Sequence, residues 1–353
     1  MELDARIFIP GHSGLAGSAI CRRLEAGGYR DLIVRSHSQL DLSRRQEVDE
    51  FFAREKPEYV FLCAAKVGGI HANDTYPVDF LLENLKIQNN VIEAAFRNSV
   101  KGLLFLGSSC IYPGEAPQPL REDYLLTGPL EPTNRAYAIA KIAGIELCKA
   151  FNRQHHTRFL SVMPTNLYGP NDRYDLENSH LVPALIRKFH LGKLAAQKDF
   201  AAIGREASCY GPIPRDILEG LEKDEGPEVR LWGTGAPMRE LLHSDDMADA
   251  CVFLMERAEG LFEGESERLA ASPVFNVGAG RDITIRELAH TVAGVVGFSG
   301  RVSWDPSKPD GTLRKLLDVS RMRELGWESK ISLEEGLRAT YRDYVSKLSR
   351  GCK

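Results

Sequence analysis

Short apolar runs alternate with longer amphipathic segments through the first half of the chain. The runs are continuous rather than alternating, which is typical of strands that are covered on both faces of a sheet. They occupy residues 6–10, 32–34, 59–63, 103–106 and 159–163. The segments between them carry apolar residues at helical spacing, with long ones at 77–97 and 135–155. Strands that alternate with helices predict an α/β fold with a parallel, doubly wound sheet.

The second half of the chain is less regular. Residues 193–229 contain glycines, prolines and many charges without clean periodicity, so we expect a mostly irregular insertion there. Thr284 is followed three residues later by Glu287, a spacing that predicts the capped start of a helix. Two further segments, near 240–258 and 273–280, are expected to return to the domain formed by the first half.

Composition narrows the class of protein. With 43% hydrophobic residues the chain has enough apolar material for a sizeable core, and its net charge of -4 does not suggest a nucleic-acid partner. We expect no signal peptide and no contact with a membrane, because no apolar stretch approaches the roughly 20 residues of a membrane span. The 7 cysteines lack metal-site spacing, so we expect reduced thiols, no metal and a cytoplasmic location.

A glycine-rich turn follows the first predicted strand and opens the first helix. Gly11, Gly14 and Gly17 stand in GxxGxxG spacing. In dinucleotide sites the first glycine permits a tight turn, the second lets the backbone approach a pyrophosphate, and the third lets the helix pack on the strand. The free N–H groups of the helix start also suit phosphates. Glycines cluster in ordinary turns too, but this position favours a dinucleotide site.

The end of the second strand indicates which dinucleotide binds. An acidic residue there would hold a ribose 2′-hydroxyl, whereas this chain has Arg35 and, two residues later, His37. We therefore expect NADP(H), with Arg35 as the main partner of the 2′-phosphate and a contribution from protonated His37; a solvated strand end is the alternative interpretation. Asp41 and Leu42 lie a few residues later, near the expected adenine.

A Ser–Tyr–Lys set predicts the chemistry. Ser108 follows the fourth strand, and Tyr137 and Lys141 stand four apart on the next helix, so they share one face. The ordinary pKa of a tyrosine, about 10, is too high for efficient acid–base work at neutral pH, and a nearby ammonium lowers it. Ser108 would donate a hydrogen bond to the carbonyl oxygen that Tyr137 protonates. A YxxxK pattern alone recurs by chance on surfaces, but its setting here favours a reductase.

These observations divide the chain. Residues 1–170 are expected to form a Rossmann-type NADP-binding domain, together with the returning segments, and residues 171–353 a smaller, mixed α/β substrate-binding domain. Ligands of such sheets bind at the carboxyl ends of the strands. The expected cofactor contacts are Gly11, Ser13, Gly14, Leu15, Gly17, Arg35, His37, Asp41, Leu42, Ala64, Ala65, Leu106, Gly107, Ser108, Tyr137, Lys141, Pro164, Asn166, Leu167 and His180.

Several longer motifs carry a family resemblance over nearly the whole chain. They lie at residues 64–70, 107–113, 131–134, 137–144, 164–170 and 308–311. In these motifs the chain resembles the GDP-L-fucose synthases, a family of extended short-chain dehydrogenase/reductases. The resemblance implies conversion of GDP-4-keto-6-deoxy-D-mannose to GDP-L-fucose, by inversion of carbons 3 and 5 and then NADPH-dependent reduction at carbon 4. It also implies a homodimer, for which helices 77–97 and 135–155 are the expected interface.

The resemblance also assigns residue roles. Inversion needs acid–base groups on opposite faces of the sugar, and the resemblance implies Cys110 as the base and His180 as the acid. Taken alone, Cys110 is more typical of a small buried apolar residue and His180 of a polar helix start. The substrate contacts implied are Asn166, Lys188, Trp232, Arg239 and Asp282. Bacterial members of the family carry arginines where this chain has Ser13 and His37.

Two alternatives stay open on the sequence. A related nucleotide-sugar epimerase or dehydratase would retain NAD and show no net redox chemistry. A non-catalytic dinucleotide sensor would be expected to lose Tyr137 or Lys141, and this chain keeps both.

Overall fold

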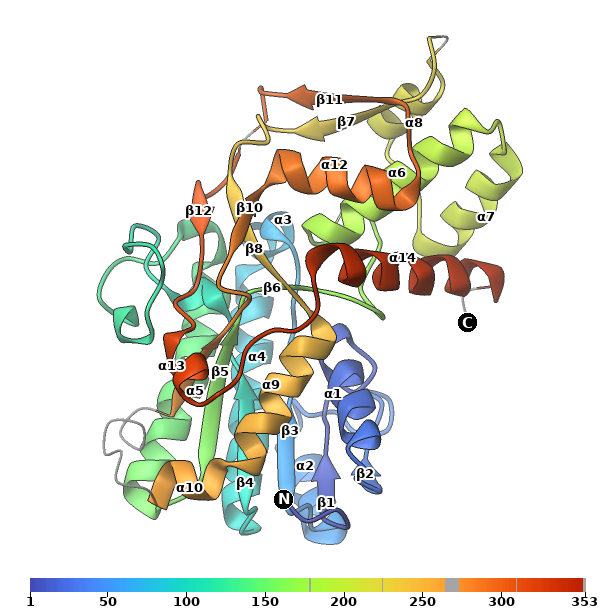
Figure 1. Ribbon diagram of the computed structural model, residues 1–353. Helices are drawn as coiled ribbons and strands as arrows, with labels where there is room; N and C mark the ends of the chain where they lie inside the picture. The colour runs from blue at the N-terminus through green and yellow to red at the C-terminus, as the bar shows by residue number, and fades with distance from the viewer. Residues whose placement is uncertain (178, 224, 264–272, 309, 352–353) are drawn as a thin grey trace.

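The larger of two lobes is built on a six-stranded parallel sheet, seen in the computed structural model of Figure 1. The structure describes residues 1–177, 179–223, 225–263, 273–308 and 310–351. Strand order is β2-β1-β3-β4-β5-β9, with every pair parallel. The strands are β1 (Arg6–Phe8), β2 (Asp31–Ile33), β3 (Tyr59–Leu62), β4 (Gly102–Leu106), β5 (Phe159–Pro164) and β9 (Val274–Val277). The predicted α/β fold with a doubly wound sheet is confirmed.

Helices cover both faces of this sheet. Successive strand residues point to opposite sides, so Phe8 packs in one apolar cluster while Ile7 and Ile9 pack in the other. The first cluster is covered by α2 (Arg45–Glu55), α4 (Pro77–Arg97) and α5 (Arg135–His155), and the second by α1 (Leu15–Ala26) and α9 (Ser244–Glu256). The short helices α3 (Ile70–Thr75) and α10 (Ala258–Glu263) complete this lobe. Burial on both faces explains why the strands read as continuous apolar runs.

The smaller lobe combines two small sheets with helices (Figure 1). One sheet centres on β8 (Met238–His243), which pairs with β6 (Asn166–Tyr168), β10 (Asp282–Thr284) and β12 (Arg314–Lys315). The other pairs β7 (Glu228–Trp232) with β11 (Arg301–Asp305). The helices are α6 (Leu181–Ala196), α7 (Phe200–Tyr210), α8 (Arg215–Leu221), α12 (Ile285–Val296) and α14 (Leu333–Ser349). The short helix α13 (Ser320–Glu324) instead packs on the large lobe, where Met322 lies in the second apolar cluster. Thr284 and Glu287 form the predicted capping box of α12.

The expectation of a mostly irregular segment at 193–229 is wrong. Helix α6 continues to Ala196, α7 and α8 follow, and β7 begins at Glu228. Asp199 caps α7 by accepting a hydrogen bond from the N–H of Ala202 at 2.9 Å. The reason lies partly in a buried ion pair between Arg187 of α6 and Glu206 of α7. A charged residue at a buried position breaks the apolar pattern by which a helix is recognised from sequence.

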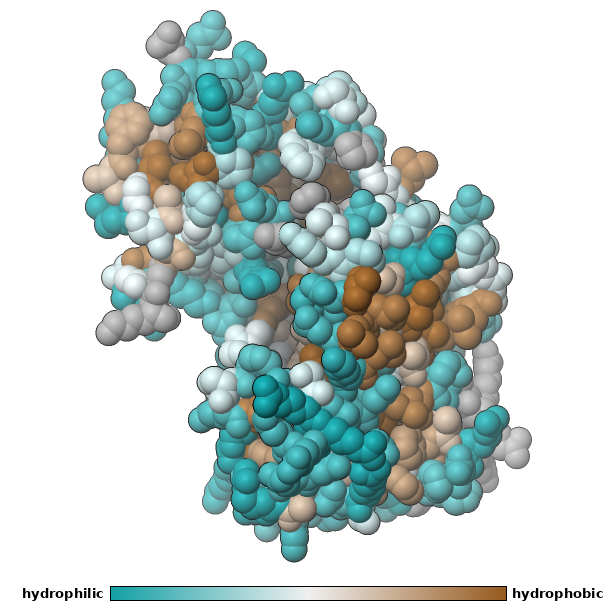
Figure 2. All heavy atoms as spheres, turned by 180° about the vertical axis from the view of Figure 1, so that it is seen from behind, coloured by the Kyte–Doolittle hydropathy of each residue, from teal (hydrophilic) through white to brown (hydrophobic). Residues whose placement is uncertain are grey.

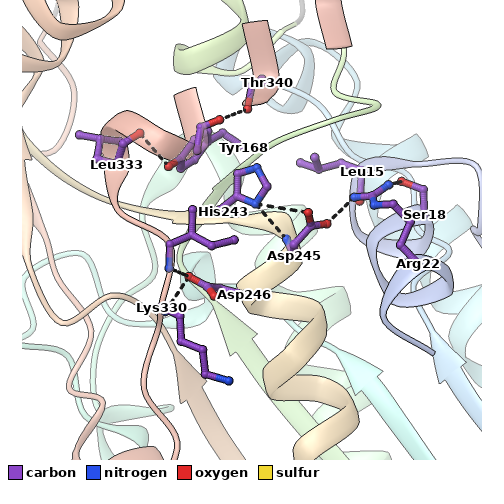
Figure 3. A network of polar contacts seen from close by, with 12 residues as sticks. Leu15, Ser18, Arg22, Tyr168, His243, Asp245, Asp246, Lys330, Leu333 and Thr340 are labelled. Carbon is purple, nitrogen blue, oxygen red and sulfur yellow. Dashed lines mark hydrogen bonds and ion pairs between the residues drawn. The ribbon is translucent and has the colours of Figure 1, made fainter. Parts of the chain in front are cut away.

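A polar network at the start of α9 ties the two lobes together (Figure 3). The Tyr168 hydroxyl donates to the carbonyl of Leu333 at 3.3 Å, at the start of α14. The Asp246 carboxylate on α9 accepts from the N–H groups of Lys330 at 3.1 Å and Ile331 at 2.9 Å. His243, at the end of β8, accepts from the N–H of Asp245 at 3.3 Å. The start of α9 therefore holds the chain that leads into α14.

Three residues that bear on the sequence analysis lie outside the described ranges, and the expectation for the cysteines needs correction. Asn178, beside His180, and Pro309 and Cys352 lie outside the part of the chain that the structure describes. Cys209 on α7 is disulfide-bonded, which corrects the expectation that all cysteines are reduced. Cys21, Cys63, Cys110, Cys148 and Cys251 are free.

Within the described ranges no helix is long and apolar enough to cross a membrane, and no cluster of side chains is arranged to hold a metal.

Candidate active site

One cavity of about 1720 Å³ extends from the glycine turn into the smaller lobe. It follows the carboxyl ends of the parallel strands, where such sheets bind ligands. All the predicted cofactor and catalytic residues line it. Of the predicted substrate residues, Asn166, Lys188, Trp232 and Arg239 line it and Asp282 does not. The cavity therefore has a dinucleotide end in the large lobe and a second end in the small lobe, with Ser108, Cys110 and Tyr137 between them.

The glycine turn is packed so closely that side chains are excluded. Gly11 has a φ of +87°, and a Cβ there would lie 2.7 Å from the backbone nitrogen of Ala64. A Cβ on Gly17 would collide with the carbonyl oxygen of Gly11. Gly14 has more room, and its N–H donates to the Gly11 carbonyl at 3.1 Å. The turn therefore brings bare backbone to the start of α1, as a pyrophosphate requires.

Arg35 lines the cavity but is already engaged. Its Nη2 donates to the Glu55 carboxylate at 3.0 Å, and its guanidinium lies 5.7 Å from the centre of the Phe51 ring. His37 and Asp41 also line this end. The Asp41 carboxylate accepts hydrogen bonds from the hydroxyl and N–H of Ser43, which lower its pKa. A phosphate on the ribose would thus compete with Glu55 for Arg35.

Ser108, Tyr137 and Lys141 meet where β4 ends. Ser108 caps a short 3₁₀ turn (Ser109–Ile111) by accepting a hydrogen bond from the N–H of Cys110 at 3.2 Å. Lys141 is buried, and its Nζ donates to the carbonyl of Leu106 at 2.8 Å. The same ammonium lies 5.8 Å from the centre of the Tyr137 ring. Its positive charge therefore lies close to the Tyr137 phenol.

Burial dominates the ionisation of this pair. It raises the pKa of Tyr137, which the neighbouring Cys110 raises further and a hydrogen bond with Ser108 opposes. It lowers the pKa of Lys141 to about 8, with Cys63 acting in the opposite direction. In the resting site the tyrosine is therefore protonated and ready to donate, and the lysine titrates close to physiological pH. A general acid in this state suits a ketone that becomes an alcohol.

Cys110 and His180 approach the same part of the cavity from different lobes. Cys110 lies on the turn after β4, and His180 precedes the first residue of α6. Burial alone would raise the pKa of Cys110, but the charge of Lys315 and hydrogen bonds from Ser108 and Lys315 lower it overall. The pKa of His180 is lowered by desolvation and then by Lys315. The sequence reasoning missed Lys315, although it lies in the basic stretch just after the motif at 308–311.

The second end of the cavity combines cations with an aromatic face. Burial lowers the pKa of Lys188, and Asp216 opposes this. Trp232 is 60% exposed. Nη1 of Arg239 donates to the carbonyls of Met238 and Thr312 at 2.8 and 2.6 Å, which orients the guanidinium. Cations and an exposed indole suit a diphosphate attached to a base and a sugar.

The structure does not bring Asp282 to this cavity. Its carboxylate is bound to Arg314 at 2.5 and 3.3 Å and is 8% exposed. Asp310 lines the cavity instead, where it accepts from the N–H and hydroxyl of Thr234 at 2.6 and 2.8 Å. The motif at 308–311 contains Asp310, so the signal was present in the sequence. Asp216 and Ile217 of α8 also line the cavity, and so the segment at 193–229 belongs to the site.

The fold and the site together define an enzyme that works with a nicotinamide dinucleotide. A model of the NAD dependent epimerase/dehydratase family matches residues 7–278, and the chain belongs to this family. The chain is 51% identical to GDP-L-fucose synthase 1 of Arabidopsis thaliana, over 98% of this chain and 95% of the relative. It is 49% identical to the GDP-L-fucose synthase of Escherichia coli, over 98% of each. The resemblance inferred from the motifs is confirmed.

Solved structures agree with this placement. A GDP-D-glycero-L-gluco-heptose synthase from Campylobacter jejuni, solved in the presence of NADPH, matches with a TM-score of 0.88 and 37% identity. The match covers 98% of this chain and 99% of the other.

Proposed function

We propose that this enzyme converts GDP-4-keto-6-deoxy-D-mannose to GDP-L-fucose, by inverting carbons 3 and 5 and then reducing carbon 4 with NADPH. The observation that carries the proposal is the meeting of two sets of groups in one cavity. Ser108, Tyr137 and Lys141 suit carbonyl reduction, whereas Cys110 and His180 suit proton transfer at carbon. Full-length relatives with about 50% identity carry the name GDP-L-fucose synthase.

The inversions follow from the acidity of the carbons that flank a ketone. The Cys110 thiolate removes the proton from carbon 3 or 5, and the electron pair moves onto the oxygen at carbon 4. Ser108 and Tyr137 donate hydrogen bonds to this oxyanion, which stabilises the enolate. His180, protonated from solvent, returns a proton to the opposite face and inverts the centre. Each inversion therefore exchanges the proton on that carbon with solvent.

Reduction uses the same oxygen. NADPH held at the glycine turn would supply the hydride for carbon 4. Tyr137 donates its proton to the oxygen at carbon 4. The ammonium of Lys141 stabilises the resulting phenolate. The glycine turn fits a dinucleotide, because its excluded side chains leave backbone at the pyrophosphate position. None of these steps uses a metal ion.

The preference for NADP(H) over NAD(H) rests on Arg35 and His37. Both line the dinucleotide end, and the end of β2 carries no acidic residue that would repel a 2′-phosphate. Binding of the phosphate draws Arg35 away from Glu55. Kinetics with NADPH and NADH test this, and Arg35→Met is expected to raise the KM for NADPH while changing the KM for NADH little. An equal effect on both cofactors would remove Arg35 from the 2′-phosphate site.

A homodimer is also part of the proposal. Val78 and Leu82 on α4 and Ile139 on α5 are 68%, 48% and 43% exposed. Figure 2 shows an apolar area over these helices. Large exposed apolar patches are typical of interfaces. Light scattering with size-exclusion chromatography is expected to give twice the chain mass of 39.3 kDa, and Val78→Asp with Leu82→Asp to shift it to the monomer.

The proposal places the enzyme in the cytoplasm and gives it a nucleotide sugar, not nucleic acid or membrane, as partner. The free cysteines Cys21, Cys63, Cys110, Cys148 and Cys251 fit a reducing compartment. The disulfide at Cys209 runs against it. Fractionation of the source cells decides between the two.

Incubation with NADPH and GDP-4-keto-6-deoxymannose tests the central proposal. We expect one NADPH consumed for each GDP-L-fucose formed, read from absorbance at ~340 nm and from analysis of the sugar product. Unchanged absorbance with an epimerised ketone would instead identify an NAD-retaining epimerase. Binding of NADPH without any change in the sugar would identify a dinucleotide sensor.

A further inference from the structure

Lys315 brings an uncompensated positive charge to Cys110. It is the last residue of β12, and its Nζ donates to the Cys110 Sγ at 3.3 Å. The side chain lines the same cavity as Cys110 and His180. Among the described residues no carboxylate forms an ion pair with Lys315, whereas its neighbour Arg314 is paired with Asp282. The charge of Lys315 therefore acts on the cavity rather than on an acidic partner.

The backbone around Lys315 is held in place from both sides. Lys315 pairs with Arg239 in the sheet of the smaller lobe. The next residue, Leu316, donates its N–H to the Gln118 side chain at 2.9 Å and accepts from the N–H of Leu120 at 2.7 Å. These bonds join the strand to the loop that follows the Cys110 turn. The base of the Lys315 side chain therefore has a defined position relative to Cys110.

A buried carboxylate completes this support. Glu240 of β8 has no exposed surface, and it accepts hydrogen bonds from the N–H groups of Leu317 at 2.9 Å and Gly280 at 2.7 Å. It thereby connects the residue two positions after Lys315 to the turn that follows β9. This arrangement fixes where the Lys315 ammonium can lie. It does not neutralise the charge of that ammonium.

The other groups around Cys110 divide into those that favour its charge and those that oppose it. Ser108 provides a hydrogen bond, and Lys315 provides both a hydrogen bond and a full positive charge. Glu131 opposes ionisation, and Tyr137 faces the thiol from α5 as a neutral phenol. Lys315 is thus the cation that opposes the effect of burial and favours the ionised form of this thiol. The same charge acts against protonation of His180.

We propose that Lys315 is a positioning residue for the acid–base pair: its ammonium keeps Cys110 in the thiolate form and opposes the positive form of His180. It transfers no proton itself. The consequence is that the pKa values of Cys110 and His180 are lowered together, so that the base is available at neutral pH. The part that concerns catalysis rests on the proposed function, whereas the ionisation of Cys110 can be measured on the free enzyme.

Alkylation of Cys110 by iodoacetamide tests the proposal without any substrate. The thiolate is the reactive form, so the rate reports its fraction. The rate is followed between pH 6 and 10 by mass spectrometry of the Cys110 peptide, with the full-length enzyme as purified. Lys315→Met is expected to slow alkylation at pH 7 about tenfold and to move the profile to higher pH. Lys315→Arg should retain most of the rate, because it keeps the charge.

A matched control removes a lysine elsewhere. Lys149 lies on the outer part of α5, where it pairs with Glu146 at 2.8 Å, and Lys149→Met should leave the profile unchanged. An unaltered profile in folded Lys315→Met would overturn the proposal. The wild-type enzyme provides a second test that does not depend on folding of a variant. If its Cys110 titrates at or above the ordinary value of about 8.5, the proposal also fails.

Solvent exchange then links the charge to catalysis. Deuterium incorporation at carbons 3 and 5 depends on an ionised Cys110 and a protonated His180, and so has a bell-shaped pH profile. Removal of the Lys315 charge should move both limbs of this profile to higher pH, whereas a purely structural defect would lower its height. A shift in alkylation without exchange by the wild-type enzyme would support the role of Lys315 and reject the proposed substrate. If both limbs of the exchange profile stay at the same pH in Lys315→Met, Lys315 has no role in the reaction.

Discussion

Arg187 and Glu206 form an ion pair with both side chains excluded from solvent. Nε and Nη2 of the arginine lie 2.7 and 3.2 Å from the two carboxylate oxygens, and the side chains are 0% and 1% exposed. Tyr344 of α14 donates its hydroxyl to the same carboxylate at 2.6 Å. The pair therefore joins α6, α7 and α14. Since α6 carries Lys188 and α7 leads into α8, it also supports the second end of the cavity.

Removal of one partner is expected to destabilise the smaller lobe strongly. Glu206→Ala leaves a buried guanidinium without its counter-charge, which typically costs about 3–5 kcal/mol. The free energy of unfolding from urea titration measures this. Glu219→Ala provides the control, because Glu219 pairs with Arg215 at a surface where both side chains are mostly exposed. Similar losses in the two variants would show that the buried pair has no special role.

Gly17→Ala is expected to abolish binding of the dinucleotide. The added methyl group collides with the carbonyl oxygen of Gly11, so the glycine turn has to move away from the pyrophosphate position. Quenching of protein fluorescence by NADPH measures the binding. Gly204→Ala on α7 is the matched control, because a Cβ there meets no atom within 4 Å. Unchanged affinity in Gly17→Ala would place the cofactor elsewhere.

Reduction and inversion should separate by mutation. Tyr137→Phe removes the proton donor, and we expect NADPH consumption to fall by about 10²–10⁴-fold while deuterium exchange at carbons 3 and 5 persists. Cys110→Ser should instead abolish deuterium exchange at carbons 3 and 5, because a hydroxyl is a far weaker base than a thiolate. NADPH should still bind to this variant. The two measurements use spectrophotometry and mass spectrometry of the sugar. Full exchange in Cys110→Ser would exclude Cys110 as the base.

His190 should make stability depend on pH. Desolvation, and then Lys193, lower its pKa from 6.5 to about 4. Between these values the unfolded chain binds a proton that the folded chain does not, so stability falls as pH falls from 6.5 to 4. The shift corresponds to ~3 kcal/mol across this window. Below pH 4 the contribution levels off, because both states are then protonated.

Comparison of wild type with His190→Gln isolates this contribution. The difference in unfolding free energy between the two proteins should change across the window from pH 6.5 to 4. Other buried groups titrate in both proteins and cancel, including Asp172, whose pKa burial raises to about 7. If the unfolding free energies of the two proteins differ by the same amount at every pH, His190 is protonated in the folded protein as readily as in the unfolded chain.

The large lobe was predictable because its signals are local. Each strand of the sheet is a short apolar run, and the turns after β1 and β4 carry Gly11 and Ser108 in recognisable motifs. The helices α4 and α5 match the predicted ranges 77–97 and 135–155. In this lobe Gly11, Gly14, Gly17, Ser108, Tyr137 and Lys141 all line the cavity, since parallel strands bring their carboxyl ends to one edge.

The smaller lobe was harder to predict because its order depends on distant partners. Helix α7 has a charged residue, Glu206, at its buried position, and only the pairing with Arg187 makes that burial favourable. Asp282 and Asp310 are both acidic residues of the same half of the chain, and although Asp310 belongs to the motif at 308–311, the motif alone does not say that its side chain reaches the cavity and that of Asp282 does not. Contacts between distant residues decide it: Asp282 is held by the Arg314 side chain, and Asp310 accepts a hydrogen bond from the N–H of Thr234.

The amino-acid sequence by itself determined the doubly wound sheet, the dinucleotide turn and the Ser108–Tyr137–Lys141 set. These depend on residue spacing within single elements, which periodicity and steric demand reveal. Only the tertiary structure decided the partners of charges: Arg35 with Glu55, Arg187 with Glu206 and Lys315 with Cys110. The physical reason is that electrostatic energy depends on distance and burial in space, and residues 205 apart in the chain can lie 3.3 Å apart in the fold.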